Sequence, residues 1–249
     1  MVDLIYCELL KLKRSKLLLL SALGALATPA MMLVEMLQTH FQHPERLFTL
    51  ADVYDDSLIY VMLLMNLMVC AVVAAYLFSR EYGERTLKNI LPVPVAKTSL
   101  LAGKFCVLLL WVLLLTIVTW AGTLAVSALY HVLFGLPGFG VGVALHWLGK
   151  LLTGGVLMFL VLSPFTYLAE KARGLVLPMI VAAVVVMGSA ALCNQEFGAL
   201  YPWTAAYFLV DGSLAATGYP LWLSLGVLGS VSAAGFAATL IAFCRADVK

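Results

Sequence analysis

Long stretches of apolar residues, almost without charged side chains, constrain the fold of this chain more than any other feature of its sequence. The hydrocarbon core of a bilayer is about 30 Å thick, and a helix rising 1.5 Å per residue crosses it in about 20 residues. Stretches of this length lie at residues 17–37, 57–79, 105–130, 149–169, 174–194 and 220–244. Since lipid offers the backbone no hydrogen bonds, each is expected to be an α-helix. The sequence therefore predicts an all-α polytopic membrane protein with six transmembrane helices.

The composition points the same way. Of the residues, 63% are hydrophobic and 11% are charged, whereas an ordinary soluble domain is about a quarter charged. A net charge of +2 gives no basis for a nucleic-acid partner. Residues 1–249 are therefore expected to form a single transmembrane domain without a soluble domain attached.

The Lys and Arg residues gather in alternate segments between the predicted spans. Thirteen of the fifteen lie in segments that fall on one predicted side: 1–16, 80–104, 170–173 and the C-terminal tail. Arg46 and Lys150 are the exceptions, and Lys150 stands at a span boundary from which its side chain can reach outward. Short loops rich in Lys and Arg stay in the cytoplasm. Both termini are therefore predicted to be cytoplasmic, with the acidic segment 38–56 outside.

Residues 3–14 are predicted to form an amphipathic N-terminal helix. Its apolar side chains share one helical stripe, comprising Leu4, Ile5, Leu9 and Leu12, and its charged side chains lie elsewhere, at Glu8, Lys11 and Arg14. Such a helix can lie in the interface of the inner leaflet. The alternative is a plain basic flank of the first span, retained in the cytoplasm by its charges.

The segment between the second and third spans has the most specific pattern in the chain. From Arg80 to Lys97 it reads Arg-Glu-Tyr-Gly-Glu-Arg-Thr-Leu-Lys-Asn-Ile-Leu-Pro-Val-Pro-Val-Ala-Lys, followed by Leu100, Leu101, Gly103 and Lys104. A short amphipathic helix is predicted at 84–91, ended by Pro92 and Pro94. Its apolar side chains can dock on a soluble partner while neighbouring charges fix the register. An ordinary solvated loop is the alternative.

This segment resembles the second cytoplasmic segment of the permeases of type-2 ATP-binding cassette (ABC) exporters. In that family it reads as an acidic residue, two further residues, a Gly-Thr-like pair, Leu-Lys, two Leu-like residues, Pro, Val, a basic residue and then Gly-Lys. This chain departs by having Glu84 and Arg85 between Gly83 and Thr86. The resemblance extends to the six-span layout and the amphipathic start. It implies a coupling helix whose residues contact an ATPase subunit: Glu81, Gly83, Glu84, Thr86, Leu87, Ile90, Leu91, Pro92 and Lys97.

No ATP-hydrolysing site is expected in this chain. The GxxxxGK[ST] pattern is missing, and Lys97 and Thr98 follow Val-Ala instead of a glycine turn able to cradle phosphates. Catalytic, cofactor-binding and metal-binding residues are likewise not expected. The resemblance therefore implies a permease subunit that is not itself an enzyme, with ATP and Mg²⁺ bound by a separate partner.

The short length and compact loops are most similar to the permeases of bacterial lantibiotic-immunity and bacitracin-resistance exporters. That similarity implies a multi-pass protein of the bacterial cytoplasmic membrane, whose substrate is an antimicrobial peptide exported or removed from the membrane. It also implies two copies of an ABC ATPase subunit, a second copy of the permease or a paralogous permease, and contact with membrane lipid.

Other functions stay open as alternatives. An ATP-independent secondary transporter would be expected to show internal repeats and charged or broken helices at the midplane. An export permease for lipid or drug would share the predicted architecture. An intramembrane enzyme would need paired carboxylates, HExxH or GxSxG within the spans, and the spans contain none of these patterns.

Four polar residues inside the spans are candidates for contact with substrate: Asn66, Thr116, Thr119 and Thr123. The threonines recur at helical spacing on the third span, and Asn66 is an amide that needs partners in hydrocarbon. Hydrogen bonding between helices is the favoured interpretation, and a substrate surface is the alternative.

Small residues recur every four positions on the last span, at Gly226, Ser230, Ala234 and Ala238. Such a face lets helix backbones approach closely, so it is assigned to packing within or between permeases. The acidic outer segment 38–56 can attract a cationic or metal-complexed peptide, although a plain solvated loop is the favoured interpretation.

Overall fold

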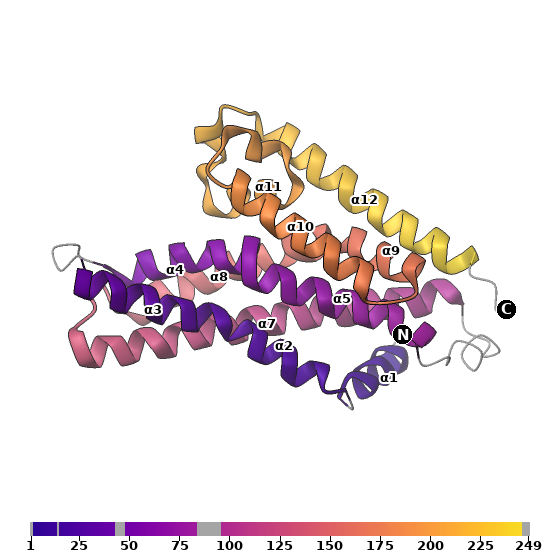
Figure 1. Ribbon diagram of the computed structural model, residues 1–249, viewed down its shortest axis with the longest axis horizontal. Coiled ribbons are helices and arrows are strands. Elements are labelled where there is room, and N and C mark those ends of the chain that lie inside the picture. The colour runs from indigo at the N-terminus through magenta and orange to yellow at the C-terminus, as the bar shows by residue number, and fades with distance from the viewer. Residues whose placement is uncertain (1, 14, 43–47, 84–95, 246–249) are drawn as a thin grey trace.

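The computed structural model describes residues 2–13, 15–42, 48–83 and 96–245. Every regular element within these ranges is a helix, and most of the helices run lengthwise along an elongated molecule (Figure 1). The prediction of an all-α protein is therefore confirmed for the described part of the chain.

The chain begins with α1 (Val2–Lys13), followed by α2 (Leu17–Ala25) and α3 (Ala27–Gln42). Pro29 stands in the first turn of α3, where the backbone N–H that proline lacks is not needed by the helix. The stretch Leu19–Gln42 is long and apolar enough to cross a membrane. It contains most of the first predicted span.

A continuous helical stretch from Leu50 to Tyr82 contains the second predicted span. It consists of α4 (Leu50–Ile59), a π-helical segment (Tyr60–Leu64) and α5 (Met65–Gly83). A capping box fixes its start, because the backbone N–H of Thr49 donates to Asp52 Oδ2 at 2.8 Å and the backbone N–H of Asp52 donates to Thr49 Oγ1 at 3.3 Å.

The third and fourth predicted spans also lie within longer helical stretches. α7 (Lys97–Phe134) has 38 residues, which corresponds to about 57 Å at 1.5 Å per residue. It therefore extends well beyond the hydrocarbon core. α8 (Val141–Val161) and α9 (Ser163–Ala172) follow one another with a break at Leu162, and together they are long enough to cross a membrane.

The C-terminal part of the chain is less regular. α10 (Val176–Leu192) is followed by three short elements, η2 (Glu196–Leu200), α11 (Pro202–Asp211) and η3 (Ser213–Thr217), and then by the long α12 (Leu221–Arg245).

Among the described residues, five helical stretches are long and apolar enough to span a membrane. The fifth predicted span corresponds to α10, which has 17 residues, or about 26 Å at 1.5 Å per residue. This length is slightly below a full hydrocarbon thickness. The number of six transmembrane crossings therefore stays a prediction.

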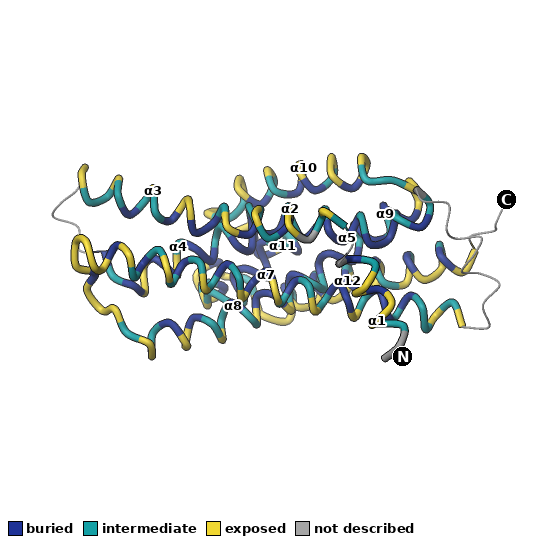
Figure 2. The backbone as a smooth tube through the Cα atoms, turned by 90° about the horizontal axis from the view of Figure 1, so that it is seen from below, coloured by how far each residue is buried: buried dark blue, intermediate teal, exposed yellow. Residues whose placement is uncertain are grey.

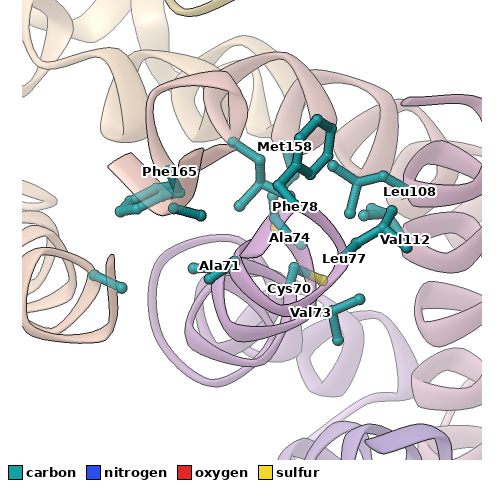
Figure 3. Packing of buried hydrophobic residues seen from close by; sticks show 14 of the residues in the cluster. Cys70, Ala71, Val73, Ala74, Leu77, Phe78, Leu108, Val112, Met158 and Phe165 are labelled. Carbon is teal, nitrogen blue, oxygen red and sulfur yellow. The ribbon is translucent and has the colours of Figure 1, made fainter. Parts of the chain in front are cut away.

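α5 lies in the middle of the bundle and supplies much of its core. Cys70, Ala74 and Phe78 are fully buried, and Figure 3 shows this helix surrounded by side chains from its neighbours, including Leu108 and Val112 of α7, Met158 of α8 and Phe165 of α9. In contrast, the outward side of α10 is exposed along its length (Figure 2), at Val176, Ile180, Val184 and Met187. Apolar side chains on the outside of a membrane protein face lipid.

Basic and acidic side chains gather at opposite ends of the long axis of the molecule. α1, the last turns of α5, the first turns of α7 and the C-terminal end of α12 lie at one end (Figure 1), which we call the basic end. Two contacts join these elements: Arg80 Nη1 donates to Lys11 O at 2.8 Å, and Lys97 Nζ donates to Cys244 O at 3.2 Å. Both described termini therefore lie at the same end, as an even number of crossings requires. The orientation in the membrane stays a prediction.

Candidate functional site

Most of the predicted coupling residues lie outside the described part of the chain. These are Glu84, Thr86, Leu87, Ile90, Leu91 and Pro92. The residues on either side are described: α5 ends at Gly83, and α7 begins at Lys97. The structure therefore describes how the two ends of this segment are held, at the basic end of the molecule.

Glu81, one of the predicted coupling residues, is buried inside the protein. Its side chain forms an ion pair with Lys104 of α7, with Lys104 Nζ 2.9 Å from Glu81 Oε2. Lys104 is 0% exposed and Glu81 is 4% exposed, and the lysine also donates to the backbone oxygen of Leu77 at 3.3 Å. Glu81 therefore contacts neighbouring helices, and its carboxylate is not presented at the surface.

The N-terminal helix extends this ion pair. Lys11 Nζ lies 3.6 Å from the other carboxylate oxygen of Glu81, and it also pairs with Glu8 of its own helix. Burial lowers the pKa of Lys11, but the hydrogen bond to Glu8 and the charges of Glu8 and Glu81 outweigh it, so that the pKa is raised above its usual value.

α1 turns part of its charged face toward the protein. Glu8 and Leu12 are buried, whereas Tyr6, Leu9 and Leu10 are exposed. The residues of the predicted apolar stripe therefore do not share one environment, because Leu12 lies in the core and Leu9 is exposed. An exposed apolar face at the basic end is compatible with the predicted interfacial position, which stays a prediction.

A further contact reaches α9. The Tyr82 hydroxyl donates to Glu170 Oε2 at 2.6 Å, and Glu170 is 4% exposed. The guanidinium carbon of Arg173 lies 5.4 Å from the centre of the Tyr82 ring, within the range of a cation–π contact. Four helices, α1, α5, α7 and α9, therefore meet in one group of side chains. We call it the basal charge cluster, and it consists of Glu8, Lys11, Glu81, Tyr82, Lys104 and Glu170.

A second polar group lies deep inside the helical bundle. Asn66 Nδ2 of α5 donates to Thr119 Oγ1 of α7 at 2.8 Å, and Thr119 Oγ1 lies 3.2 Å from the backbone oxygen of Ala25. Thr28 of α3 lies 3.4 Å from the amide oxygen of Asn66. These side chains are buried and connect the first three predicted spans.

Thr116 and Thr123 make only local hydrogen bonds in this group. Each donates to the backbone oxygen four residues earlier, Val112 at 2.9 Å and Thr119 at 3.0 Å. Both are buried, as are Asn66 and Thr119. The four residues considered for substrate contact therefore lie inside the protomer in this conformation.

The contact between α9 and α12 was not predicted. Ser163 Oγ lies 3.1 Å from the backbone oxygen of Ser232, and Thr166 and Thr239 share a hydrogen bond of 2.9 Å. The buried face of α12 includes Ser224, Ser232, Gly235 and Thr239, whereas Gly226, Ser230 and Ala234 are exposed. The predicted small-residue stripe is therefore not the face that packs within the protomer.

The end opposite the basic end is acidic. Asp55 of α4 lies near Asp211 of α11 and Lys150 of α8, whose charges act on its carboxylate. An apolar cavity of about 390 Å³ lies beside α11, lined by Phe208, Leu209, Gly212, Leu214, Ala215, Tyr219 and Leu221. Within the described ranges, His, Cys, Asp and Glu residues form no group able to hold a metal ion.

Apolar helices long enough to cross a bilayer, joined by buried polar contacts, define a multi-pass membrane protein. A family model described as "ABC-2 family transporter protein" matches residues 4–189, so the chain belongs to the ABC-2 transporter family. It is a permease subunit in the bacterial plasma membrane, and its family works with an ABC ATPase. The family prediction is confirmed.

The chain is also similar to a named relative. It is 29% identical over 207 residues to a bacitracin transport permease protein, BCRB, of Bacillus licheniformis. The aligned region covers 83% of this chain and 97% of that protein. The alignment therefore covers nearly the whole of the relative and most of this chain.

Proposed function

We propose that this chain is the membrane-spanning permease of an ABC exporter that removes an amphipathic antimicrobial peptide, of the bacitracin or lantibiotic type, from the membrane. The observation that carries the proposal is the similarity to a bacitracin transport permease over 83% of this chain and 97% of that protein. The proposed driving force is ATP bound with Mg²⁺ in a separate ATPase subunit, since this chain lacks a phosphate-binding glycine loop.

The proposed orientation places the basic end in the cytoplasm. Lys11, Arg80, Lys97, Lys104 and Arg173 belong to segments that the positive-inside rule retains there. The ATPase then docks on residues 84–91, with Leu87, Ile90 and Leu91 as apolar contacts. Two permeases and two ATPase subunits make up the proposed complex.

The acidic end is then on the outside of the membrane. Asp52, Asp55, Asp56 and Asp211 give it a negative charge that favours a cationic peptide. The neighbouring apolar cavity beside α11 can take an apolar side chain of the same peptide. Both features support an amphipathic substrate that combines charge with apolar groups.

Coupled ATP turnover tests the proposal. The purified chain is reconstituted with its ATPase in liposomes, and association and peptide-stimulated turnover are compared for the wild type and Leu87→Asp. A charge among the apolar contacts of residues 84–91 is expected to weaken association with the ATPase by at least about tenfold. Thr98→Asp is the matched control, because it places the same charge at an exposed position at the start of α7.

Three outcomes separate the candidate functions. Loss of association in Leu87→Asp alone, with turnover stimulated by bacitracin or a lantibiotic, supports the proposal. An ATPase that associates but responds only to lipid or drug favours another type of export permease. A wild-type chain that associates with no ATPase and still moves substrate favours an ATP-independent carrier.

A further inference from the structure

The two helices that flank the predicted coupling segment are joined by a buried ion pair. Glu81 lies two residues before the end of α5, and Lys104 lies about two helical turns after the start of α7. Their side chains meet at 2.9 Å, and Lys104 is 0% exposed. The ion pair thus connects the two described helix ends between which residues 84–95 run.

This contact has a defined geometry that apolar packing lacks. Lys104 Nζ is held between Glu81 Oε2 and the backbone oxygen of Leu77, one turn earlier on α5. A buried ion pair is no more stable than well-packed apolar side chains, but it disfavours other registers because any shift leaves a charge buried without its partner. The pair therefore fixes the position of α7 along α5.

The rest of the basal charge cluster connects this pair to two more helices. Lys11 of α1 lies 3.6 Å from Glu81 Oε1, and Tyr82, the residue after Glu81, donates to Glu170 of α9 at 2.6 Å. The charges of Lys104 and Glu81 also act on Glu170. A displacement of the end of α5 is therefore shared with α1, α7 and α9.

We propose that Glu81 and Lys104 are positioning residues for transport, whose ion pair makes the basal ends of α5 and α7 move as one unit when the ATPase acts on the permease. This inference rests on the proposed function. It assigns Glu81 a role through Lys104 and not through contact with the ATPase. Transport then depends on the ion pair even though ATPase binding does not.

The variant Glu81→Leu/Lys104→Met tests this role, because it replaces both charges by apolar side chains and leaves no charge unpaired. Thr166→Val/Thr239→Val is the matched control, since it removes a buried polar contact between two other helices, α9 and α12. Each protein is reconstituted with the ATPase. The measurements are the Kd of the complex, the KM for ATP, and kcat with and without bacitracin.

The expected result is a split between binding and turnover. The apolar pair keeps the wild-type Kd and KM, while its peptide-stimulated kcat falls by about tenfold. The control keeps the wild-type kcat. If the apolar pair fails to fold, Glu81→Gln/Lys104→Met takes its place, because it is nearly isosteric at position 81 and also leaves no buried charge unpaired, with an expected fall in kcat of about threefold.

Other results overturn the inference in distinguishable ways. Wild-type coupling in the apolar pair, or an equal loss in the control, shows that the ion pair has no special role. A raised Kd shows that the two residues act on ATPase binding and not on coupling alone, which overturns the inference but leaves the proposed function intact. A wild-type chain that binds no ATPase overturns both.

Discussion

Asn66 Nδ2 of α5 donates a hydrogen bond to Thr119 Oγ1 of α7 at 2.8 Å, and both residues are buried in the middle of the bundle. The same threonine oxygen lies 3.2 Å from the backbone oxygen of Ala25. One hydroxyl thus connects three helical segments that are far apart in the sequence. In a membrane, where apolar burial does not drive helices together, such contacts favour one arrangement of the helices.

The first prediction compares two threonines on the same helix. Thr119→Val removes the hydrogen bond that Asn66 of α5 donates and the one that the Thr119 hydroxyl donates to the backbone oxygen of Leu115 or Ala25, whereas Thr123→Val removes only a bond to the carbonyl of Thr119 within α7. The first variant is expected to lower the free energy of unfolding by about 1 kcal/mol, as buried interhelical hydrogen bonds do. The second is expected to change it by a few tenths, about 0.3 kcal/mol.

Denaturant unfolding of the purified protein in micelles measures both values. Equal stabilities for the two variants would show that the interhelical bonds contribute little. A Thr119→Val protein with normal stability but altered peptide response would instead favour the substrate-contact alternative.

The second prediction concerns the close approach of α9 and α12. A Cβ atom at Gly235 would lie 2.7 Å from the carbonyl carbon of Ser163 and 2.8 Å from the nitrogen of Pro164. Backbone atoms cannot move aside as a flexible side chain can. Gly235→Ala is therefore expected to destabilise the fold by about 1–3 kcal/mol, in spite of the higher helix propensity of alanine.

Gly229→Ala is the control on the same helix, because a Cβ atom there would meet nothing within 4 Å. It is expected to leave the thermal unfolding midpoint unchanged or slightly raised. The contact between α9 and α12 is disproved if the two alanine variants have the same midpoint.

The helices could be predicted from the sequence because their length and apolar content are local properties. Five of the predicted spans correspond to stretches such as Leu50–Tyr82 and Lys97–Phe134. The structure extends these helices beyond the predicted limits, because polar residues such as Lys104 continue a helix outside the hydrocarbon core. Only tertiary packing reveals where such an extension ends.

The faces that pack could not be predicted in the same way. On α12 the sequence assigns the stripe with Gly226 and Ser230 to packing within or between permeases, but the face buried within the protomer is the one with Ser232, Gly235 and Thr239. In lipid both faces of a span are apolar, so hydrophobicity does not mark the buried side. The deciding contacts, with Ser163 and Thr166 of α9, come from a distant part of the chain.

The contacts of the charged residues in the basal charge cluster could not be predicted from the sequence either. The resemblance of segment 80–97 to the coupling segment of type-2 ABC permeases placed Glu81 among the residues that contact an ATPase subunit. The protein buries it against Lys104, which lies 23 residues later in the chain. No helical periodicity connects these two positions. Only the folded arrangement of α5 and α7 brings them together.

The third prediction concerns the pH dependence of stability. The pKa of Lys11 is raised above its usual value of 10.5 because Glu8 and Glu81 outweigh its burial. A raised pKa in the folded state gives stability that is fully present below the unfolded-state value and is lost as the pH rises through the folded-state value. Lys11→Met is therefore expected to be less stable than the wild type at pH 8.

The side chain of Lys11 is 38% exposed, so solvent screening limits the expected difference to less than about 1 kcal/mol. The difference should shrink above pH 10.5. Lys16→Met, at an exposed position after α1, is the control. Urea titrations at pH 8 and above pH 10.5 provide the measurement, and a difference that grows at high pH would contradict the assignment.

The last prediction tests the number of crossings. Gln195 is exposed and follows α10, the short helix that corresponds to the fifth predicted span. Cys7 and Cys244 are exposed near the two ends of the chain. Six crossings place these two cysteines inside the cell and residue 195 outside. An impermeant maleimide added to intact cells is therefore expected to label Gln195→Cys, in a background without the other cysteines, and to leave single-cysteine proteins with Cys7 or Cys244 unlabelled until the cells are permeabilised.

Protection of Cys7 and Cys244 together with protection of residue 195 would show that α10 turns back within the membrane. Labelling of Cys7 in intact cells would reverse the proposed orientation of the basic end. The 17 residues of α10 give it a length of only about 26 Å, so this experiment distinguishes a tight crossing from a re-entrant helix.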